Sequence, residues 1–413
     1  MSAAPFSRDA RNEARAGLYV HVPFCATRCS YCDFSSGALS AAALERYLAA
    51  LEREIARRAP QAAGLEFHSV FFGGGTPSAL SARHFERVWR ALSARFAIKR
   101  GAEITLEANP ESVRPALLDA WARAGVNRLS FGAQSFVPEE LAALGRIHSA
   151  ARPAEAMALA RAHGFLRLSL DLMFGFPGHT LEHWRRTVDA ALALEPGHLS
   201  AYCFIPEPGT PLGAAVLRGE QALPRGDEQA ECYEALARWI APGGYAAYET
   251  SNFCRPGEEA RHNLVYWLRR PYLGLGPSAH GLVHGVRYGN HYALERWAAA
   301  LEAGAPCEAE REEESDRTIA LEVVMLGLRL SDGIDRRDYD ARTWRAVEGR
   351  YGAALDLALA AGRLEPTAHG VRIPGRFAFV ADDVIAWIEA RADRARWAPD
   401  PAVRGLTVAA TAP

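Results

Sequence analysis

Residues 19–34 read YVHVPFCATRCSYCDF, a short apolar strand that runs directly into three cysteines. Cys25, Cys29 and Cys32 have the spacing C-x3-C-x2-C. The remaining four of the seven cysteines are scattered along the chain: Cys203, Cys232, Cys254 and Cys307. An odd and dispersed set does not form a disulfide framework, so the composition predicts a reducing cytoplasm. The cluster predicts three thiolates that share one metal group.

Three kinds of site can use neighbouring thiolates. A structural zinc ion takes four ligands, usually in two separated pairs, and the sequence has no second pair. A redox C-x-x-C formed by Cys29 and Cys32 would leave Cys25 without a role. Three thiolates on a 4Fe–4S cluster leave one iron without a protein ligand, where a small molecule can chelate. The spacing therefore favours the iron–sulfur cluster, with zinc as the alternative.

Short β-rich segments alternate with amphipathic helical segments over the first 240 residues. The predicted strands are 18–24, 68–74, 104–110, 126–134, 166–177 and 198–206. The predicted helices between them include 41–59, 82–96, 111–125 and 181–195. Six β–α units in succession predict an α/β fold built on a partial (β/α)6 TIM-like barrel, open or closed, in preference to a two-winged Rossmann sheet.

Composition divides the chain into five parts. They are a flexible N-terminus at 1–14, the barrel at 15–240, an irregular connecting segment at 241–310, a small and mainly helical domain at 311–392, and a mobile tail at 393–413. The N-terminus lacks the apolar core of a secretory signal, and no run approaches ~18 apolar residues, so no membrane span is expected. A formal net charge of -2 gives no electrostatic case for a nucleic-acid partner.

Chemically unusual residues follow the predicted strands. These stretches are GGGTP at 73–77, EANPE at 107–111, GAQSF at 132–136, DLMFGFPG at 171–178 and EPGTP at 207–211. In a barrel, the C-terminal ends of the strands meet on one face, so we expect one composite site there. Glycines at 73–75 let backbone groups approach a ligand closely; the alternative is a tight strand-to-helix turn.

With C-x3-C-x2-C and GGGTP together, residues 15–240 resemble the radical S-adenosylmethionine superfamily. In that superfamily the amino and carboxylate groups of S-adenosylmethionine bind the unique iron of the cluster. The resemblance implies contacts to S-adenosylmethionine from Tyr19, Tyr31, Gly74, Gly75, Thr76, Glu107, Gln134, Arg146 and Asp171. Carboxylates can accept hydrogen bonds from ammonium or ribose hydroxyls, and a guanidinium can pair with a carboxylate. Arg146 could instead form a surface salt bridge, and His21 either packs within its strand or lies near the cluster.

A narrower resemblance rests on YVHVPFC, FFGGGTPS, SFGAQSF, LGRIH and SLDLMFGFPG. These motifs, with the C-terminal domain, resemble the group that contains the oxygen-independent coproporphyrinogen III oxidase HemN and the haem chaperone HemW. The oxidase carries a further cysteine two residues after the third, whereas here Asp33 and Phe34 follow Cys32. The oxidase also has a longer segment before its cysteines. Both differences favour the chaperone branch, with the oxidase as the alternative.

The stretch HNLVYW at 262–267 matches the HNxxYW pattern of the HemW branch, which is implicated in haem binding. By this resemblance the haem-binding candidates are His262, Asn263, Tyr266 and Trp267. An imidazole can supply a nitrogen to haem iron, and the aromatic rings offer flat apolar surface. Two alternatives stay open: the motif is a capping pair with core aromatics, or the iron ligand is His280, His284 or Cys254. The resemblance implies haem as cargo, haem-acceptor proteins and an electron donor as partners.

Overall fold

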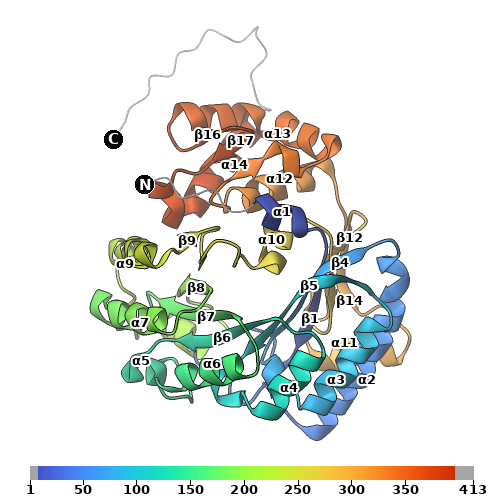
Figure 1. Cartoon of the computed structure of the whole chain (residues 1–413). Helices are drawn as coiled ribbons and strands as arrows, with labels where there is room; N and C mark the ends of the chain where they lie inside the picture. The colour runs from blue at the N-terminus through green and yellow to red at the C-terminus, as the bar shows by residue number, and fades with distance from the viewer. Residues whose placement is uncertain (1–7, 396–413) are drawn as a thin grey trace, which may run out of the picture. The chain divides into compact units, whose positions relative to one another are not determined.

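The computed structural model describes residues 8–395, which form two compact units that meet in sequence at Glu314 and Ser315 (Figure 1). Residues 1–7, half of the predicted flexible N-terminus, and 396–413, most of the predicted tail, lie outside the described residues. The other half of the predicted N-terminus contains helix α1 (Arg8–Glu13), which buries Ala10 and Arg11. No helix among the described residues is both long and apolar enough to cross a bilayer.

The six predicted strands form the parallel centre of one large sheet in the first unit. They are β1 (Gly17–Val22), β4 (Glu66–Gly74), β5 (Ala97–Ala108), β6 (Arg128–Gln134), β7 (Arg167–Phe174) and β8 (His198–Cys203). Each pairs in parallel with the next in that order. Strand β5 begins earlier than predicted because Ala97 and Ile98 pair with β4, although the first five residues of the strand are mostly exposed.

Helices connect these strands and cover the outer side of the sheet, as Figure 1 shows. They include α2 (Ala41–Arg58), α3 (Ala82–Ser93), α4 (Pro115–Arg123), α6 (Arg152–Ala162), α7 (Leu181–Ala193) and α9 (Gly226–Ile240). Side-chain oxygens of Ser40, Ser81 and Thr180 accept backbone N–H groups at the starts of α2, α3 and α7. Such N-caps satisfy donors that have no partner inside the helix. Each helix then buries one apolar face on the strands.

Residues 241–310 were expected from their composition to be irregular, but they form regular helices and strands. They contribute β9 (Ala246–Ala247), β10 (Asn252–Cys254), α10 (Arg261–Trp267), β11 (Tyr272–Leu275), β12 (His280–Val283), β13 (Val286–Asn290), α11 (Leu294–Glu302) and, running on to Glu313, β14 (Glu308–Glu313). Strand β11 pairs in parallel with β1, whereas β10 pairs antiparallel with β8. The segment thus extends both edges of one sheet. Its strands are too short, and too often interrupted by Gly or Pro, to give a clear alternation of apolar and polar residues.

The sheet does not close. Its strand order is β14-β13-β12-β11-β1-β4-β5-β6-β7-β8-β10-β9, so β14 and β9 are free edges among the described residues. The fold is therefore a mixed α/β fold with an open, partial barrel of parallel strands, which decides between the open and closed forms that the strand–helix alternation allowed.

The second unit is mainly helical, as predicted. It contains α12 (Asp316–Gly327), α13 (Ala341–Ala360) and α14 (Ala381–Ala395). Buried Val323, Val347, Tyr351 and Ile388 belong to its core. A small antiparallel sheet of β15 (Ile334–Asp335), β17 (Gly370–Arg372) and β16 (Glu365–Thr367) was not predicted, because each strand has at most three residues.

Candidate functional site

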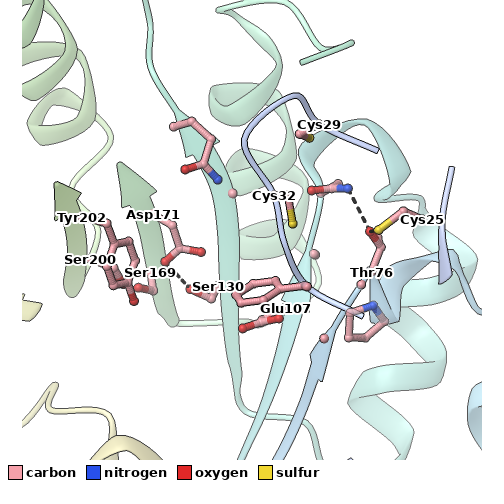
Figure 2. Close-up of a pocket in the computed structure, with 18 of the residues that line it drawn as sticks. Cys25, Cys29, Cys32, Thr76, Glu107, Ser130, Ser169, Asp171, Ser200 and Tyr202 are labelled. Atoms are coloured by element: carbon pink, nitrogen blue, oxygen red, sulfur yellow. Dashed lines mark hydrogen bonds between the residues drawn. The ribbon is translucent and has the colours of Figure 1, made fainter. Parts of the chain in front are cut away.

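A cavity of about 380 Å³ is lined by the cysteine loop and by side chains along the parallel strands, from the first residues of β6 and β8 to the C-terminal ends of the strands. Figure 2 shows the cysteines on one side, with Asp171, Ser200 and Tyr202 of β7 and β8 facing them across the space. Side chains with polar groups come from successive strands because parallel strands bring their ends to one edge of the sheet. The composite site expected from the sequence is therefore a real cavity.

All three loop cysteines line this cavity. Cys25 Sγ lies 3.3 Å from Thr76 Oγ1. Burial raises the pKa of Cys32 to about 11; the Phe34 backbone N–H opposes this, and the other two thiols add to it. Three thiolates therefore need a bound cation to coexist here.

The donor set fits a cluster better than a single ion. No group of three or more His, Cys, Asp or Glu side chains in the described part of the chain is close enough to hold one metal ion. A 4Fe–4S cluster binds each thiolate through a different iron, which calls for wider spacing than a tetrahedral zinc site. Thiols that share one cavity without converging on one point match that requirement.

The glycines at the end of β4, Gly74 and the following Gly75, are needed for packing within the protein. Gly74 has φ 107°, and a Cβ there would lie 2.6 Å from the His21 ring. A Cβ on Gly75 would lie 2.7 Å from the Phe24 carbonyl oxygen. The glycine run also lines the cavity. These glycines are therefore required where the chain packs closely against its own residues His21 and Phe24, a contact that the sequence did not reveal.

Glu107 and Asp171 face the cavity from β5 and β7. Burial raises the pKa of Glu107 to about 8, with the charge of Asp171 adding to the effect and a hydrogen bond from the Gly74 backbone opposing it. Burial likewise raises the pKa of Asp171, although Ser200 and Ser130 donate hydrogen bonds to it, the latter over 2.9 Å. Two partly buried carboxyl groups, one of which raises the pKa of the other, favour a cationic or hydrogen-bond-donating ligand.

Arg146 is not a surface residue in a salt bridge. Its Nη2 donates to the Gly132 carbonyl at 2.8 Å and to Asn109 Oδ1 at 2.9 Å, and Nη1 donates to Cys29 Sγ at 3.3 Å. Its Nε is buried without a hydrogen-bond partner in the described structure. The guanidinium therefore links the cysteine loop to β6, and its Nε–H remains available to donate a hydrogen bond to a ligand.

Of the residues predicted to contact S-adenosylmethionine, the structure brings together all except Tyr19 in the cavity lining. Gln134 reaches it from a β-bulge with φ 64°, an uncommon conformation for a residue other than glycine. Tyr19 Oη instead lies 3.1 Å from His21 Nδ1. His21 satisfies both expectations for it, because its buried ring packs at β1 and its Nε2 lies 2.8 Å from the Ser35 carbonyl, beside the cysteine loop.

The sequence analysis missed part of the lining. The additional polar residues are Thr105, Asn109, Arg128, Ser130, Ser169, His198, Ser200 and Tyr202. Most lie two or four residues from a lining position on the same strand, as Ser169 does from Asp171. Side chains alternate between the two faces of a strand, so counting in steps of two from Glu107, Asp171 and Gln134 would have found Thr105, Asn109, Ser169, Ser130 and Arg128. No site residue was predicted on β8, so His198, Ser200 and Tyr202 could not be found in this way.

The HNxxYW motif lies on α10 against the sheet. His262 is 1% exposed; its Nδ1 lies 2.9 Å from Ser69 Oγ and its Nε2 lies 2.9 Å from Tyr266 Oη. Burial lowers the pKa of His262 to about 3, so the ring is neutral. Both ring nitrogens are used, and neither is free for iron in this structure. Asn263 lines the cavity, whereas Tyr266 and Trp267 are half-buried.

The alternative haem ligands lie apart from this motif. His280 and His284 are exposed at β12 and the turn after it, and Cys254 is buried in β10. The structure therefore does not gather one set of haem-binding side chains from these candidates.

An open barrel of parallel strands with three cysteines and a glycine-rich strand end facing one cavity defines a radical S-adenosylmethionine fold. Comparison with known proteins agrees, since residues 19–191 match the Radical SAM superfamily and residues 315–376 match the HemN C-terminal domain. "Heme chaperone HemW" of Mycobacterium tuberculosis is 37% identical over 372 residues, which cover 89% of this chain and 93% of that protein. The chain belongs to the HemW heme chaperone family.

A second relative supports this placement, and a solved structure shows the same fold. "Heme chaperone HemW" of Bacillus subtilis is 34% identical over 343 residues, which cover 82% of this chain and 90% of that protein. The solved structure of coproporphyrinogen III oxidase HemN from Escherichia coli has a TM-score of 0.78 and 22% identity, covering 93% of this chain and 92% of that chain. At that identity the likeness shows the fold alone.

Proposed function

We propose that this protein is a haem chaperone, which binds haem and passes it to acceptor proteins. The observation that carries the proposal is the similarity to proteins named heme chaperone HemW over nearly the whole length of both chains. The residues after the third cysteine support it. Asp33 and Phe34 stand where the resemblance gives the oxidase another cysteine, and Phe34 lines the mouth of the cavity with 58% of its surface exposed.

We also propose that Cys25, Cys29 and Cys32 hold a 4Fe–4S cluster and that S-adenosylmethionine binds beside it. Together these groups supply one-electron chemistry at a sulfonium. Glu107 and Asp171 would accept hydrogen bonds from its ammonium or ribose groups and offset its positive charge, and Arg146 would pair with its carboxylate. Two observations support this assignment: Arg146 Nε has no hydrogen-bond partner among the described residues, and the pKa values of Glu107 and Asp171 are raised.

Haem-acceptor proteins and an electron donor complete the proposed set of partners. All seven cysteines are free thiols in the structure, with Cys232, Cys254 and Cys307 buried. Free thiols persist in a reducing compartment, which supports the cytoplasm as the place of action.

Binding of S-adenosylmethionine is expected to depend on pH through Glu107. Its pKa of about 8 means that its carboxyl is mostly protonated at neutral pH. A cationic ligand favours the ionised form, so binding releases a proton below that pKa, and affinity should rise by up to about tenfold per pH unit as the pH approaches 8. Equilibrium binding measured anaerobically across a pH series checks this. Glu107→Gln should bind more weakly with a flatter profile; the same slope in the variant would assign the proton to another group.

Haem transfer is the experiment that separates the two candidate functions. The similarity of the fold to HemN keeps coproporphyrinogen III oxidation as the second candidate. Purified, cluster-loaded protein should bind haem and transfer it to an apo-haem protein. With S-adenosylmethionine and a reductant under anaerobic conditions, it should form no protoporphyrinogen from coproporphyrinogen III. Multiple-turnover decarboxylation would overturn the chaperone assignment.

A matched variant sharpens that experiment. Phe34→Cys places a thiol two residues after the third cysteine, on a side chain that already faces the cavity. We expect that this change alone will not create oxidase activity. The oxidase also differs in its longer segment before the cysteines, and one added thiol does not supply that segment. Haem binding by the variant should match that of the wild type.

A further inference from the structure

His262 lies at one end of a group of contacting rings inside the first unit. Its ring stacks on Phe71 with centroids 5.1 Å apart and planes 26° apart, and its centroid is 6.4 Å from that of Tyr19. Phe71 and Tyr19 stack on each other at 6.1 Å. The aromatic group, defined as His262, Phe71, Tyr19 and His21, thus begins on α10 and crosses β4 and β1.

The other end of the aromatic group fastens the cysteine loop. A carbonyl oxygen only accepts, so His21 Nε2 carries the proton that bonds the Ser35 carbonyl at 2.8 Å. Burial lowers the pKa of His21 and keeps the ring neutral, which leaves Nδ1 to accept from the Tyr19 hydroxyl at 3.1 Å. Ser35 follows closely on Cys32 in the chain. The Ser35 carbonyl therefore sets the tautomer of His21, and the Tyr19 hydroxyl helps to hold the ring in place, which links Tyr19 to one end of the loop.

The middle of the aromatic group borders the proposed S-adenosylmethionine site. A Cβ built on Gly73 would lie 2.8 Å from the Phe71 ring, 3.1 Å from the Tyr19 ring and 3.1 Å from Glu107 Oε2. Phe71 lines the cavity, and so does Asn263, the neighbour of His262 on α10. Of the HNxxYW motif, Asn263 therefore lines the cavity directly, whereas His262 lies behind it and packs against the lining residue Phe71.

We propose that His262 is a positioning residue for the S-adenosylmethionine site and not a ligand of haem iron, an inference that rests on the proposed function for the identity of that site. Its ring packs against Phe71, which lines the cavity, and lies near Tyr19, which contacts His21 and through it the cysteine loop. Releasing a ring nitrogen for iron would leave the buried Ser69 hydroxyl or the Tyr266 hydroxyl without its partner. Burial of an unpaired polar group is unfavourable, so the ring stays where it is.

The test measures two ligands on the same holoprotein. In His262→Ala we expect affinity for S-adenosylmethionine to fall about tenfold, equivalent to about 1.4 kcal/mol. The change that S-adenosylmethionine causes in the EPR signal of the reduced cluster should be altered as well. Haem affinity and the Soret band should stay within about twofold of the wild type, as for a substitution outside the haem site. His280→Ala, at an exposed histidine of β12, is the matched control and should change neither S-adenosylmethionine affinity nor the cluster signal.

Two further variants keep the test decisive. His262→Phe restores a flat ring against Phe71 and Tyr19, so its affinity for S-adenosylmethionine should recover to within about threefold of the wild type. Ser69→Ala keeps the imidazole and removes one of its anchors; it should weaken S-adenosylmethionine binding in the same direction, and it serves if His262→Ala does not fold.

Unchanged affinity for S-adenosylmethionine in His262→Ala, or in Ser69→Ala if the first does not fold, would overturn the proposal. A loss of haem binding in either His262 variant would overturn it too, whatever happens to S-adenosylmethionine. Failure of the wild type to transfer haem is a separate readout, which bears on the proposed function alone.

Discussion

Replacing Cys25, Cys29 or Cys32 by Ala is expected to abolish the iron–sulfur cluster, the largest single effect that the site predicts. Three thiolates are the whole set of protein ligands proposed for the cluster, so removing one leaves only two irons anchored. The wild type, reconstituted anaerobically, should carry about four irons per chain with a broad charge-transfer absorption. Each variant should lose that absorption.

Cys203→Ala is the matched control, since Cys203 lies near the end of β8 and outside the cavity lining. It should retain iron and absorption. Far-ultraviolet circular dichroism of all four variants should match the wild type, because the three loop cysteines are only half-buried. Stoichiometric zinc without iron in the wild type would contradict the cluster and return the site to the zinc alternative.

Gly74→Val is expected to eliminate measurable binding of S-adenosylmethionine. Gly74 has φ 107°, where a β-branched residue is strongly strained, and a Cβ there would lie 2.6 Å from the His21 ring. The backbone around Gly74 must shift to relieve that contact. This shift displaces the Gly74 N–H, which donates a hydrogen bond to Glu107, and the backbone of Gly74 and Gly75 that lines the cavity. Strain of about 1–3 kcal/mol plus the displaced contacts corresponds to a loss of about a hundredfold or more in affinity.

Gly209→Val provides the control on another loop at the same end of the sheet. A Cβ at Gly209 meets nothing within 4 Å, and its φ lies outside the left-handed region. The control should bind S-adenosylmethionine as the wild type does, and iron content should stay largely unchanged in both variants. Equal affinity of Gly74→Val and wild type would show that this loop does not form part of the binding site.

The parts of the fold that the sequence predicted well have local causes. Strands β1, β4, β6, β7 and β8 are buried along most of their length, so their apolar runs appear within a few residues. The cysteine triplet is equally local, because its spacing alone places three thiols on one loop. Glu107 and Asp171 stood out as charges inside apolar strands, and both line the cavity.

The surroundings of the haem motif could not be predicted from its local sequence. HNLVYW predicted a candidate haem site, and that role stays a prediction. Its histidine is covered by β1 and β4, strands that lie some 190–240 residues earlier in the chain. A sequence pattern does not show which distant strand will cover a side chain, so the burial of His262 could not be predicted from it.

The sequence by itself determined the parallel strand–helix core, the three-cysteine loop, and most of the residues around it, because apolar runs and close spacing are properties of short segments. Only the tertiary structure decided that the barrel stays open, that residues 246–254 and 272–313 extend its two edges, that Tyr19 turns to His21, and that His262 is enclosed. Strands as short as β9–β12 are stable only through pairing with β8 or β1 and their neighbours. Burial likewise depends on which surfaces meet after folding, and neither property is present in any single stretch of the chain.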